Sequence, residues 1–530
     1  MRNLFRLIRR FRRDRRGNVA AIFAIACIPL ISAVGCAVDY SMATRMKSKL
    51  QAAADAASVG ALSVGSPAYL AAGQMGSTGP VAAGNDDARN IFNANVYANT
   101  NGGNGYSNLQ TTPNVTKTNS SLTAQISFSA DVPTTFMSLV GYQKLTVTGT
   151  SSAAGSLPMY LDFYLTLDVS GSMGLPSTSD EAVRMQSVNP DNYKQYPTGC
   201  TLACHFSPQN SACTDSGTQR YPTNNYCMGY AYSRVSQKAL GNLINMQSTA
   251  SVPKKVPGLP NSMVSGLPNS LNTDPTWGLP AVANCPTPGT DSCIQLRLDA
   301  VGYAVNQLFV TANSTMKLPQ QFRIGLYPFI QKLYSDYFPL TSSINGSPTN
   351  PSTINYAAAN LATLLDTNLN TNLGSGGTHI DNALNSLNGV IASVGNGSSS
   401  SNTLPYVFLV TDGAQDNQMK GVPNGGWSGS NHATVLSDSV NAYPNACQQL
   451  KNRNIVVSVL YIPYQKIDPV NTSFAGDEDD YANNNITNIP TSLQNCASPG
   501  FFYTANTPAD INNALQAMFN HALVTAHITN

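Results

Sequence analysis

An uncharged segment near the start of the chain most constrains what it can fold into. Residues 19–38 read VAAIFAIACIPLISAVGCAV, 20 positions without a charged side chain. A helix of that length matches the ~30 Å hydrocarbon core of a bilayer, and such a helix tolerates the proline at position 29. Eight of the first 16 residues are arginines. By the positive-inside rule they keep the N-terminus in the cytoplasm, so we predict a single-pass membrane protein whose bulk lies across the membrane.

A cleaved signal peptide is the alternative for this segment. Ala33–Cys36 resembles a lipoprotein cleavage box, with alanine where leucine is usual. The apolar run is long for a signal peptide, however, and it lacks a clear small-x-small exit. We favour a retained anchor over either kind of cleavage.

The charge distribution argues against binding to nucleic acid. The whole chain carries +2, but residues 1–16 alone contribute eight arginines and one aspartate. The remaining residues therefore have a small net negative charge, which does not give the basic surface that nucleic-acid binding needs. Charged residues make up only 11% of the chain, so Asn, Ser, Thr and Gly must supply most of the polar surface.

The cysteines indicate an oxidising compartment. Cys27 and Cys36 lie in the apolar run, and eight more lie in polar sequence: Cys200, Cys204, Cys213, Cys227, Cys285, Cys293, Cys447 and Cys496. An even number outside the cytoplasm favours disulfides, whereas the absence of any CxxC pair and a count of five histidines disfavour zinc. We predict Cys447–Cys496 and Cys285–Cys293 bridges, with the remaining four cysteines of residues 200–227 paired among themselves.

Helical periodicity continues beyond the apolar run. Small and apolar residues recur at three- and four-residue steps from Met42 to Leu62, which predicts a helical stem. With its Arg cluster, Gly17, apolar helix and Val38-Asp39-Tyr40, this N-terminal segment resembles TadE/TadG-like proteins of bacterial tight-adherence (Tad, Flp) pili. One departure is Ile22, which stands where prepilin-like members carry glutamate five residues after the processing glycine.

The next region, residues 63–156, reads as a small α/β or β region. Residues 98–107 are crowded with Gly and Asn and predict a loop. Ser121–Val132 and Lys144–Ser151 alternate with β-branched residues, which predicts two strands. The region carries no catalytic constellation.

Two apolar strands in the C-terminal half end in acidic residues. Tyr160–Leu167 leads into Asp168-Val169-Ser170-Gly171-Ser172, and Tyr406–Val410 leads into Thr411-Asp412-Gly413. Between them, Gly376-Gly377-Thr378 opens a helical pattern. Strands that alternate with helices predict an open, mostly parallel sheet. Ligands bind such sheets at the carboxyl ends of the strands, so the three segments are expected to converge there.

The residue types at these ends suit a hard divalent cation, Mg²⁺ or alternatively Mn²⁺ or Ca²⁺. The order DxSxS, Thr and Asp resembles the metal-ion-dependent adhesion site of von Willebrand factor A domains. The resemblance implies that Ser170, Ser172 and Thr378 coordinate the ion directly or nearly so, while Asp168 and Asp412 act largely through water and hydrogen bonds. It also implies that an acidic residue of a partner completes the metal shell.

We thus predict an α/β chain of four parts. These are a basic cytoplasmic tail (1–16), a transmembrane helix with a helical stem (17–62), the small region (63–156), and a Rossmann-like von Willebrand factor A domain (157–530). A long disulfide-bearing insertion at about 174–295 interrupts the last part, and it contains the repeat GLPNS at positions 258 and 266.

The resemblances imply a function in pilus assembly. The chain is expected to be a bacterial inner-membrane protein with its bulk in the periplasm, contacting other assembly proteins or pilin-like subunits through the metal site. The alternative is an adhesin that binds an external ligand through the same site. A hydrolase acting through Ser172 is disfavoured because no base or oxyanion donor is identifiable, so we expect no enzyme activity.

Overall fold

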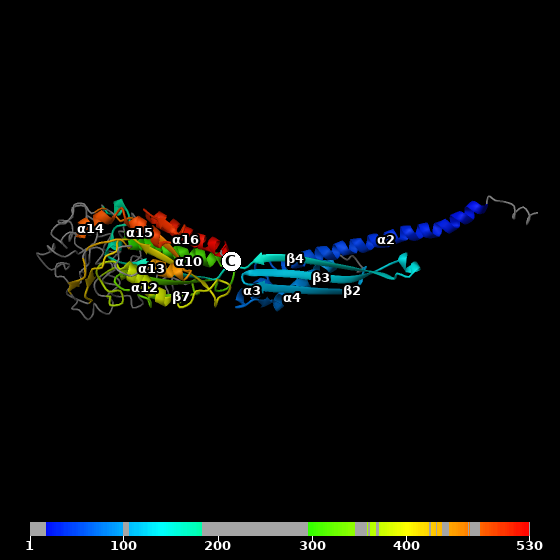
Figure 1. The fold of residues 1–530 in the computed structure, drawn as a ribbon, viewed down its shortest axis with the longest axis horizontal. Coiled ribbons are helices and arrows are strands. Elements are labelled where there is room, and N and C mark those ends of the chain that lie inside the picture. Colours follow the sequence, from blue (N-terminus) through cyan, green and yellow to red (C-terminus); the bar gives the residue numbers. More distant parts are fainter. Residues whose placement is uncertain are drawn as a thin grey trace, which may run out of the picture. The chain divides into compact units, whose positions relative to one another are not determined.

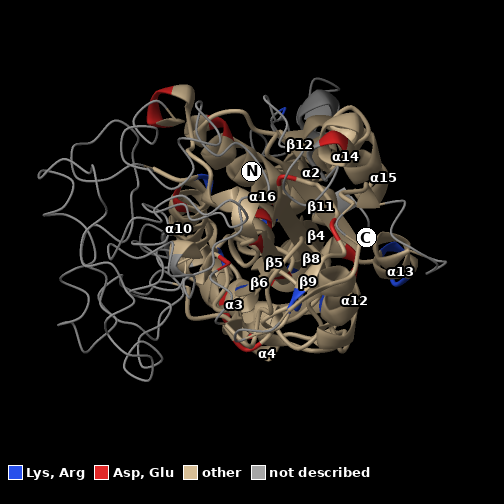
Figure 2. Ribbon diagram, turned by 90° about the vertical axis from the view of Figure 1, so that its left-hand side faces the viewer, with Lys and Arg blue, Asp and Glu red and all other residues tan. Residues whose placement is uncertain are grey.

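The computed structural model describes residues 17–98, 105–182, 295–344, 358, 361–366, 370–422, 426–430, 432–436, 445–464, 466 and 478–528. The chain divides into two compact units, Met1–Pro158 and Met159–Asn530. Figure 1 shows the order of the elements, and the ribbon in Figure 2 is mostly tan, as the 11% content of charged residues implies.

The first unit is built on one long helix, α2 (Gly17–Gly60). The predicted transmembrane helix and helical stem are thus a single uninterrupted element that includes Pro29. Among the described residues, Ile22–Gly60 of α2 is the stretch long and apolar enough to cross a membrane. Its first part exposes large apolar side chains such as Phe23 and Ile25, whereas Leu50 and the alanines at 53, 54 and 57 are buried. The helix is therefore exposed along its apolar first part and packed against the rest of the first unit along its second part.

A four-stranded antiparallel sheet covers the buried part of α2. Its strands β1 (Gly79–Pro80), β2 (Ser107–Thr118), β3 (Ser121–Pro133) and β4 (Lys144–Ser156) pair in chain order. Helices α3 (Pro67–Gln74) and α4 (Ala82–Ala98) complete the unit, and a short 3₁₀ helix, η1 (Met137–Val140), lies at the tip of the β3–β4 hairpin. The Ala-rich stripe lets the sheet approach closely, so that Ser58 and Ser151 hydroxyls lie 3.0 Å apart.

The second unit contains a six-stranded sheet in the order β12-β11-β8-β5-β6-β7. The strands are β5 (Leu161–Asp168), β6 (Phe322–Phe329), β7 (Phe338–Thr341), β8 (Leu404–Thr411), β11 (Val456–Tyr461) and β12 (Phe502–Thr504). All neighbours are parallel except β6 and β7. The central strands β5 and β8 are almost entirely buried and mostly apolar, as is typical of strands covered on both faces.

Helices cover both faces of this sheet. On one face, α10 (Arg297–Thr315) and α16 (Pro508–Ile528) pack over Phe163, which lies 5.1 Å from the ring of Phe519. On the other lie α12 (Ile380–Val390), α13 (Ala446–Asn452) and α15 (Ile489–Cys496). Shorter elements are η2 (Gly171–Gly174), η6 (Leu361–Leu364), β9 (Met419–Lys420), β10 (Trp427–Ser428) and α14 (Glu478–Asn485).

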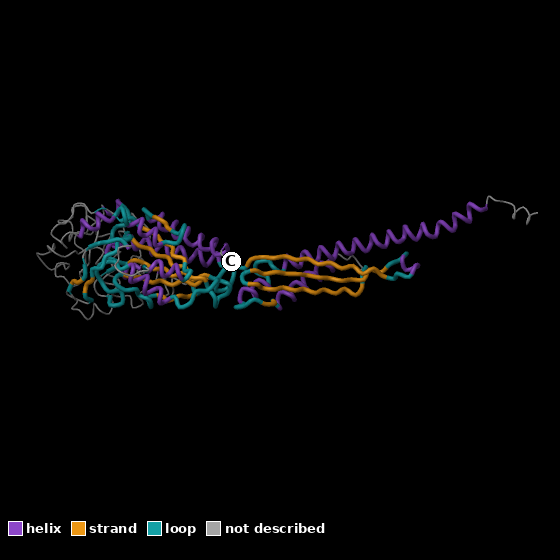
Figure 3. The backbone as a smooth tube through the Cα atoms, in the orientation of Figure 1, coloured by secondary structure: helices purple, strands orange, loops and turns teal. Residues whose placement is uncertain are grey.

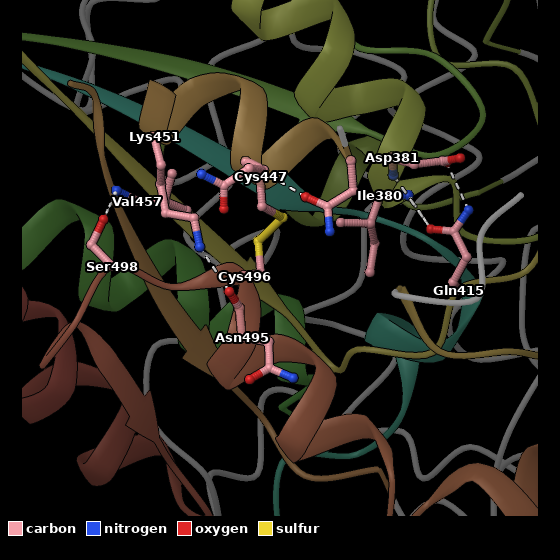
Figure 4. Close-up of a disulfide and its surroundings, with 11 residues drawn as sticks. Ile380, Asp381, Gln415, Cys447, Lys451, Val457, Asn495, Cys496 and Ser498 are labelled. Carbon is pink, nitrogen blue, oxygen red and sulfur yellow. Dashed lines mark hydrogen bonds between the residues drawn. A yellow bond between two sulfur atoms is a disulfide. The ribbon is translucent and has the colours of Figure 1, made fainter. Parts of the chain in front are cut away.

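The predicted Cys447–Cys496 disulfide is confirmed, and it joins α13 to the end of α15 (Figure 4). Beside it, Lys451 Nζ donates to the carbonyl of Asn495 at 2.8 Å. The predicted Cys285–Cys293 bridge, the cysteines of residues 200–227 and the GLPNS repeat lie outside the described residues. The described ends of the insertion meet each other, since Arg297 N donates to Leu175 O at 2.8 Å and Ser177 N to Gln295 O at 2.9 Å.

Candidate metal centre

The candidate site lies at the carboxyl ends of the two central strands. Asp168 is the last residue of β5, and Asp412 follows the last residue of β8, its parallel neighbour. Both carboxylates are buried, with 1% and 0% of their residue surfaces exposed. The strands themselves place the two side chains at one edge, because parallel strands in register end together.

The loop after β5 folds back onto the Asp168 carboxylate. Asp168 Oδ1 accepts from the backbone N–H of Ser170 at 2.9 Å, and Oδ2 accepts from the hydroxyl of Thr411 at 2.6 Å. The hydroxyl oxygens of Ser170 and Ser172 are 3.3 Å apart, and both residues are buried. Three of the predicted residues therefore share one small polar cluster.

Thr378 is brought to the same edge by a tight glycine loop. Its backbone N–H and carbonyl pair with those of Asp416, each at 3.0 Å. Gly376 and Gly377 have φ of +82° and +61°, a region that residues with a Cβ rarely adopt. A Cβ at Gly377 would also overlap the Asp416 carbonyl. Both glycines are needed for the loop to lie this close to the segment that follows β8.

Hydrogen bonds join the loop after β5, the Thr378 loop and the loop after β8. Some link backbone groups to the end of β6, and others involve a side chain of the loop after β8. Val169 N donates to Phe329 O at 3.1 Å, and His379 N donates to the next carbonyl, Ile330 O, at 3.0 Å. In Figure 4, Gln415 reaches the start of α12, where its Oε1 accepts from Ile380 N at 2.9 Å. Hydrogen bonds to neighbouring residues thus hold together the three loops that carry the predicted site residues.

A buried cation, Arg297, completes the cluster. Its Nη1 lies 3.4 Å from Asp412 Oδ2, and its side chain is 5% exposed. It is the first residue of α10, where the helix dipole disfavours a positive charge. The hydrogen bond from Arg297 N to Leu175 O, which joins the two ends of the insertion, fixes the position of Arg297. The Arg297–Asp412 ion pair therefore depends on the fold around the site as well as on α10.

Burial dominates the electrostatics of the two carboxylates. Burial first, and the neighbouring Asp412 charge second, raise the pKa of Asp168 to about 7, against the hydrogen bonds from Ser170 and Thr411. Burial also raises the pKa of Asp412, opposed by the Arg297 guanidinium and the Ser172 hydroxyl. Two negative charges this close and this buried call for more positive charge than one guanidinium supplies.

One acceptor of the site has no partner among the described residues. Asp412 Oδ1 is buried and receives no hydrogen bond, although a buried carboxylate oxygen is costly to leave unpaired. Among the described residues, no three His, Cys, Asp or Glu side chains gather into a metal site, and this cluster itself holds only two carboxylates. Hydroxyls and two carboxylates are oxygen donors, so the cluster fits a hard cation that keeps some water in its shell.

Sequence reasoning missed Arg297, Thr411, Gln415 and Asp366, whose Oδ2 accepts from Gly376 N at 2.9 Å. Arg297 did give a signal, because it is the one basic residue of a mostly apolar helical pattern over residues 296–309. The others are ordinary polar residues whose roles depend on contacts distant in the sequence.

A cavity of about 250 Å³ adjoins the Thr378 loop. Its lining includes Gly374 from that loop and the two lysines Lys332 and Lys420. The ammonium of Lys420 lies 4.5 Å from the centre of the Trp427 ring, and Lys420 N donates to Ser375 O at 2.8 Å. The surface beside the candidate site is therefore basic.

Comparison with solved structures finds low similarities. The PilB minor pilin from Streptococcus sanguinis is 9% identical with a TM-score of 0.29, over 78% of this chain and 77% of that one. The vWF domain of the type V pili tip protein Mfa5 from Porphyromonas gingivalis is 12% identical with a TM-score of 0.26, over 44% and 89%. The pilus adhesin SpaC from Lactobacillus rhamnosus GG is 11% identical with a TM-score of 0.29, and the match spans 34% of its length and 78% of this chain. All three TM-scores are too low to carry an argument about function.

No protein with a curated description matches the sequence. One family model does match it, over residues 17–72, and that family is described as putative Flp pilus-assembly TadE/G-like. The match covers α2 and most of α3 at the start of the first unit, and it agrees with the resemblance drawn above from Gly17 and the apolar helix.

Proposed function

We propose that this chain is a membrane-anchored component of Tad/Flp pilus assembly whose second unit is a von Willebrand factor A domain. In this proposal the unit binds a partner protein through a divalent cation and catalyses no reaction. The N-terminus is cytoplasmic, α2 crosses the inner membrane, and the rest is periplasmic. The family match over residues 17–72 supports the pilus role. The doubly wound sheet, with helices on both faces, supports the domain assignment.

The unpaired, buried Asp412 Oδ1 is the observation that carries the metal-dependent part. The ion, Mg²⁺ or else Mn²⁺ or Ca²⁺, would be held by Asp168, Ser170, Ser172, Thr378 and Asp412. Neutral hydroxyls leave its charge incompletely balanced, so it would attract an acidic side chain from outside. The basic cavity beside the Thr378 loop favours the same kind of partner. Other assembly proteins or pilin-like subunits with an exposed acidic residue fit this description.

Metal binding by the full-length protein in detergent tests the site. We expect wild-type protein to bind Mn²⁺ and Asp168→Asn to lose the ion, measured by electron paramagnetic resonance. Ser170→Ala should weaken binding less, because water can replace one hydroxyl in a partly hydrated shell. Asp86→Asn is the matched control, since that side chain is 75% exposed and lies in the other unit. Wild-type protein that binds no Mn²⁺ would refute the metal site.

Pilus assembly in cells tests the biological role. A deletion strain should lack pili, and Asp168→Asn should restore fewer of them than Asp86→Asn does at equal protein level. Normal pili with lost attachment to surfaces would instead support an adhesin. Full assembly and full attachment by Asp168→Asn would show that the metal site is dispensable.

A further inference from the structure

The tip of the β3–β4 hairpin combines strong exposure with apolar character. The tip, residues 134–143, reads TTFMSLVGYQ and holds no charged side chain. Leu139 is 83% exposed, Tyr142 63% and Val140 54%. Large apolar side chains gathered on a surface that no part of the described chain covers indicate a binding site for a membrane or for another protein.

The tip is fixed to α2 at the end of the apolar run. The Asp39 carboxylate accepts from the backbone N–H groups of Thr135, Phe136 and Met137 at 3.0, 2.8 and 2.7 Å. Asp39 is the first charged residue after the run of residues 19–38. A Cβ at Gly35 would overlap the Phe136 side chain. The contact surface between the tip and α2, which we call the seat, therefore extends from Asp39 into the apolar run by one helical turn, about 5 Å. Figure 3 shows the tip lying beside α2, beyond the end of β2.

The backbone of the tip is suited to a poorly hydrated environment. Besides the three N–H groups on Asp39, Leu139 N donates to Phe136 O at 3.1 Å, and Tyr142 N donates to Met137 O at 3.0 Å. Gly141, at φ +96°, closes η1 by donating to its carbonyls. Backbone groups that are satisfied internally can approach lipid without the cost of unpaired polar atoms.

We infer that this tip inserts into the outer face of the same membrane that α2 crosses. Leu139 and Val140 would enter the acyl region, and Tyr142 would lie at the headgroup level where tyrosine is enriched. The inference rests on the proposed membrane anchor. The contacts with Gly35 and Asp39 hold the tip at the level where the apolar run ends. The tip and the run therefore form one continuous apolar surface, which favours lipid as the phase that covers the tip.

Tryptophan fluorescence of full-length protein in liposomes with brominated acyl chains tests the inference. Leu139→Trp should show blue-shifted emission and quenching by shallow bromines, after subtraction of the wild-type signal of the two native tryptophans. Val59→Trp is the matched control, because Val59 is 65% exposed on the same helix but lies far beyond the apolar run. It should emit as a water-exposed residue and remain unquenched.

Ile28→Trp separates the two proposals, because Ile28 lies at the middle of the apolar run. If deep bromines quench Ile28→Trp but leave Leu139→Trp unquenched and water-exposed, the anchor stands and the inserted tip is wrong. If Leu139→Trp is blue-shifted without any bromine quenching, a protein covers the tip and the lipid inference is also overturned. If neither variant is quenched, the anchor and the tip both fail.

Discussion

At the scale of single residues, the two carboxylate oxygens of Asp412 have different surroundings. Its Oδ2 faces Arg297, whereas its Oδ1 has no partner among the described residues. Removing one member of a buried pair leaves the other charge uncompensated. In metal-free protein we therefore expect Asp412→Ala to lower the free energy of unfolding by about 3–5 kcal/mol, measured by denaturant titration.

The double variant Arg297→Met/Asp412→Ala is the control for this prediction. It removes both charges and keeps much of the buried volume, so it should be more stable than Asp412→Ala alone. Equal loss in the single and the double variant would mean that packing, and not the stranded guanidinium, accounts for the effect.

Asp131, near the end of β3 and next to the hairpin tip, makes the stability of the first unit depend on pH with a known sign. Its carboxylate accepts from Lys144 Nζ at 2.6 Å, Thr146 Oγ1 at 2.7 Å and Asn108 Nδ2 at 3.0 Å. These bonds, the one from Lys144 first, lower its pKa to about 2. Since the pKa in the unfolded chain is about 3.9, the stability from this carboxylate is present above pH 4 and is lost as the pH falls toward 2.

Thermal unfolding of the full chain between pH 5 and pH 2 measures that loss. Asp131→Asn should be less stable than wild type at pH 5, and the gap should shrink as the pH falls, because wild-type Asp131 then becomes neutral as well. A gap of constant size across this range would contradict the assignment.

The sequence allowed some residues of the candidate site to be predicted and not others. Asp168 and Asp412 follow recognisable apolar strands, so their place at strand ends could be inferred from pattern. Arg297 could not be assigned to Asp412, because the two are 115 positions apart and are joined only through the sheet. Thr411 adjoins Asp412, yet only the structure shows that its hydroxyl bonds Asp168.

At the scale of elements, the Cys447–Cys496 disulfide joins α13 to the end of α15 across 49 positions. Closing a loop of that size in the unfolded chain contributes on the order of 2–4 kcal/mol. We expect Cys447→Ser/Cys496→Ser to lower the free energy of unfolding of the second unit by that amount. Cys27→Ser/Cys36→Ser is the matched control, since both of these cysteines are free, and an equal loss in the two double variants would contradict the prediction.

Long, strongly patterned elements were predictable and short ones were not. The strands β5 and β8 have strong apolar patterns, and both were predicted within a few residues. The edge strand β7 has four residues, and β9 and β10 have two each. Pairings this short are set by the loops that carry them and leave no periodicity in the sequence.

At the scale of the whole molecule, the proposed membrane-binding surface and the candidate metal centre lie in different units of the chain. The apolar run, the seat on Asp39 and the exposed hairpin tip all belong to the first unit, whereas the candidate metal centre and the basic cavity belong to the second. A partner with an acidic side chain and a lipid bilayer would thus be recognised by different parts of one chain, and variants of one surface should leave the other unaffected.

The orientation of α2 in the membrane decides on which side the candidate metal centre lies. The Arg-rich segment of residues 1–16 should stay in the cytoplasm, because positive residues resist translocation. Alkaline phosphatase fused after Asn530 should therefore be active and should sediment with the membrane fraction, whereas the same fusion at Phe5 should be inactive. Replacing the eight arginines by asparagine should lower the activity of the C-terminal fusion, as the charge bias is lost. Activity in the soluble periplasmic fraction would instead show that the helix is cleaved, and an inactive C-terminal fusion would reverse the topology.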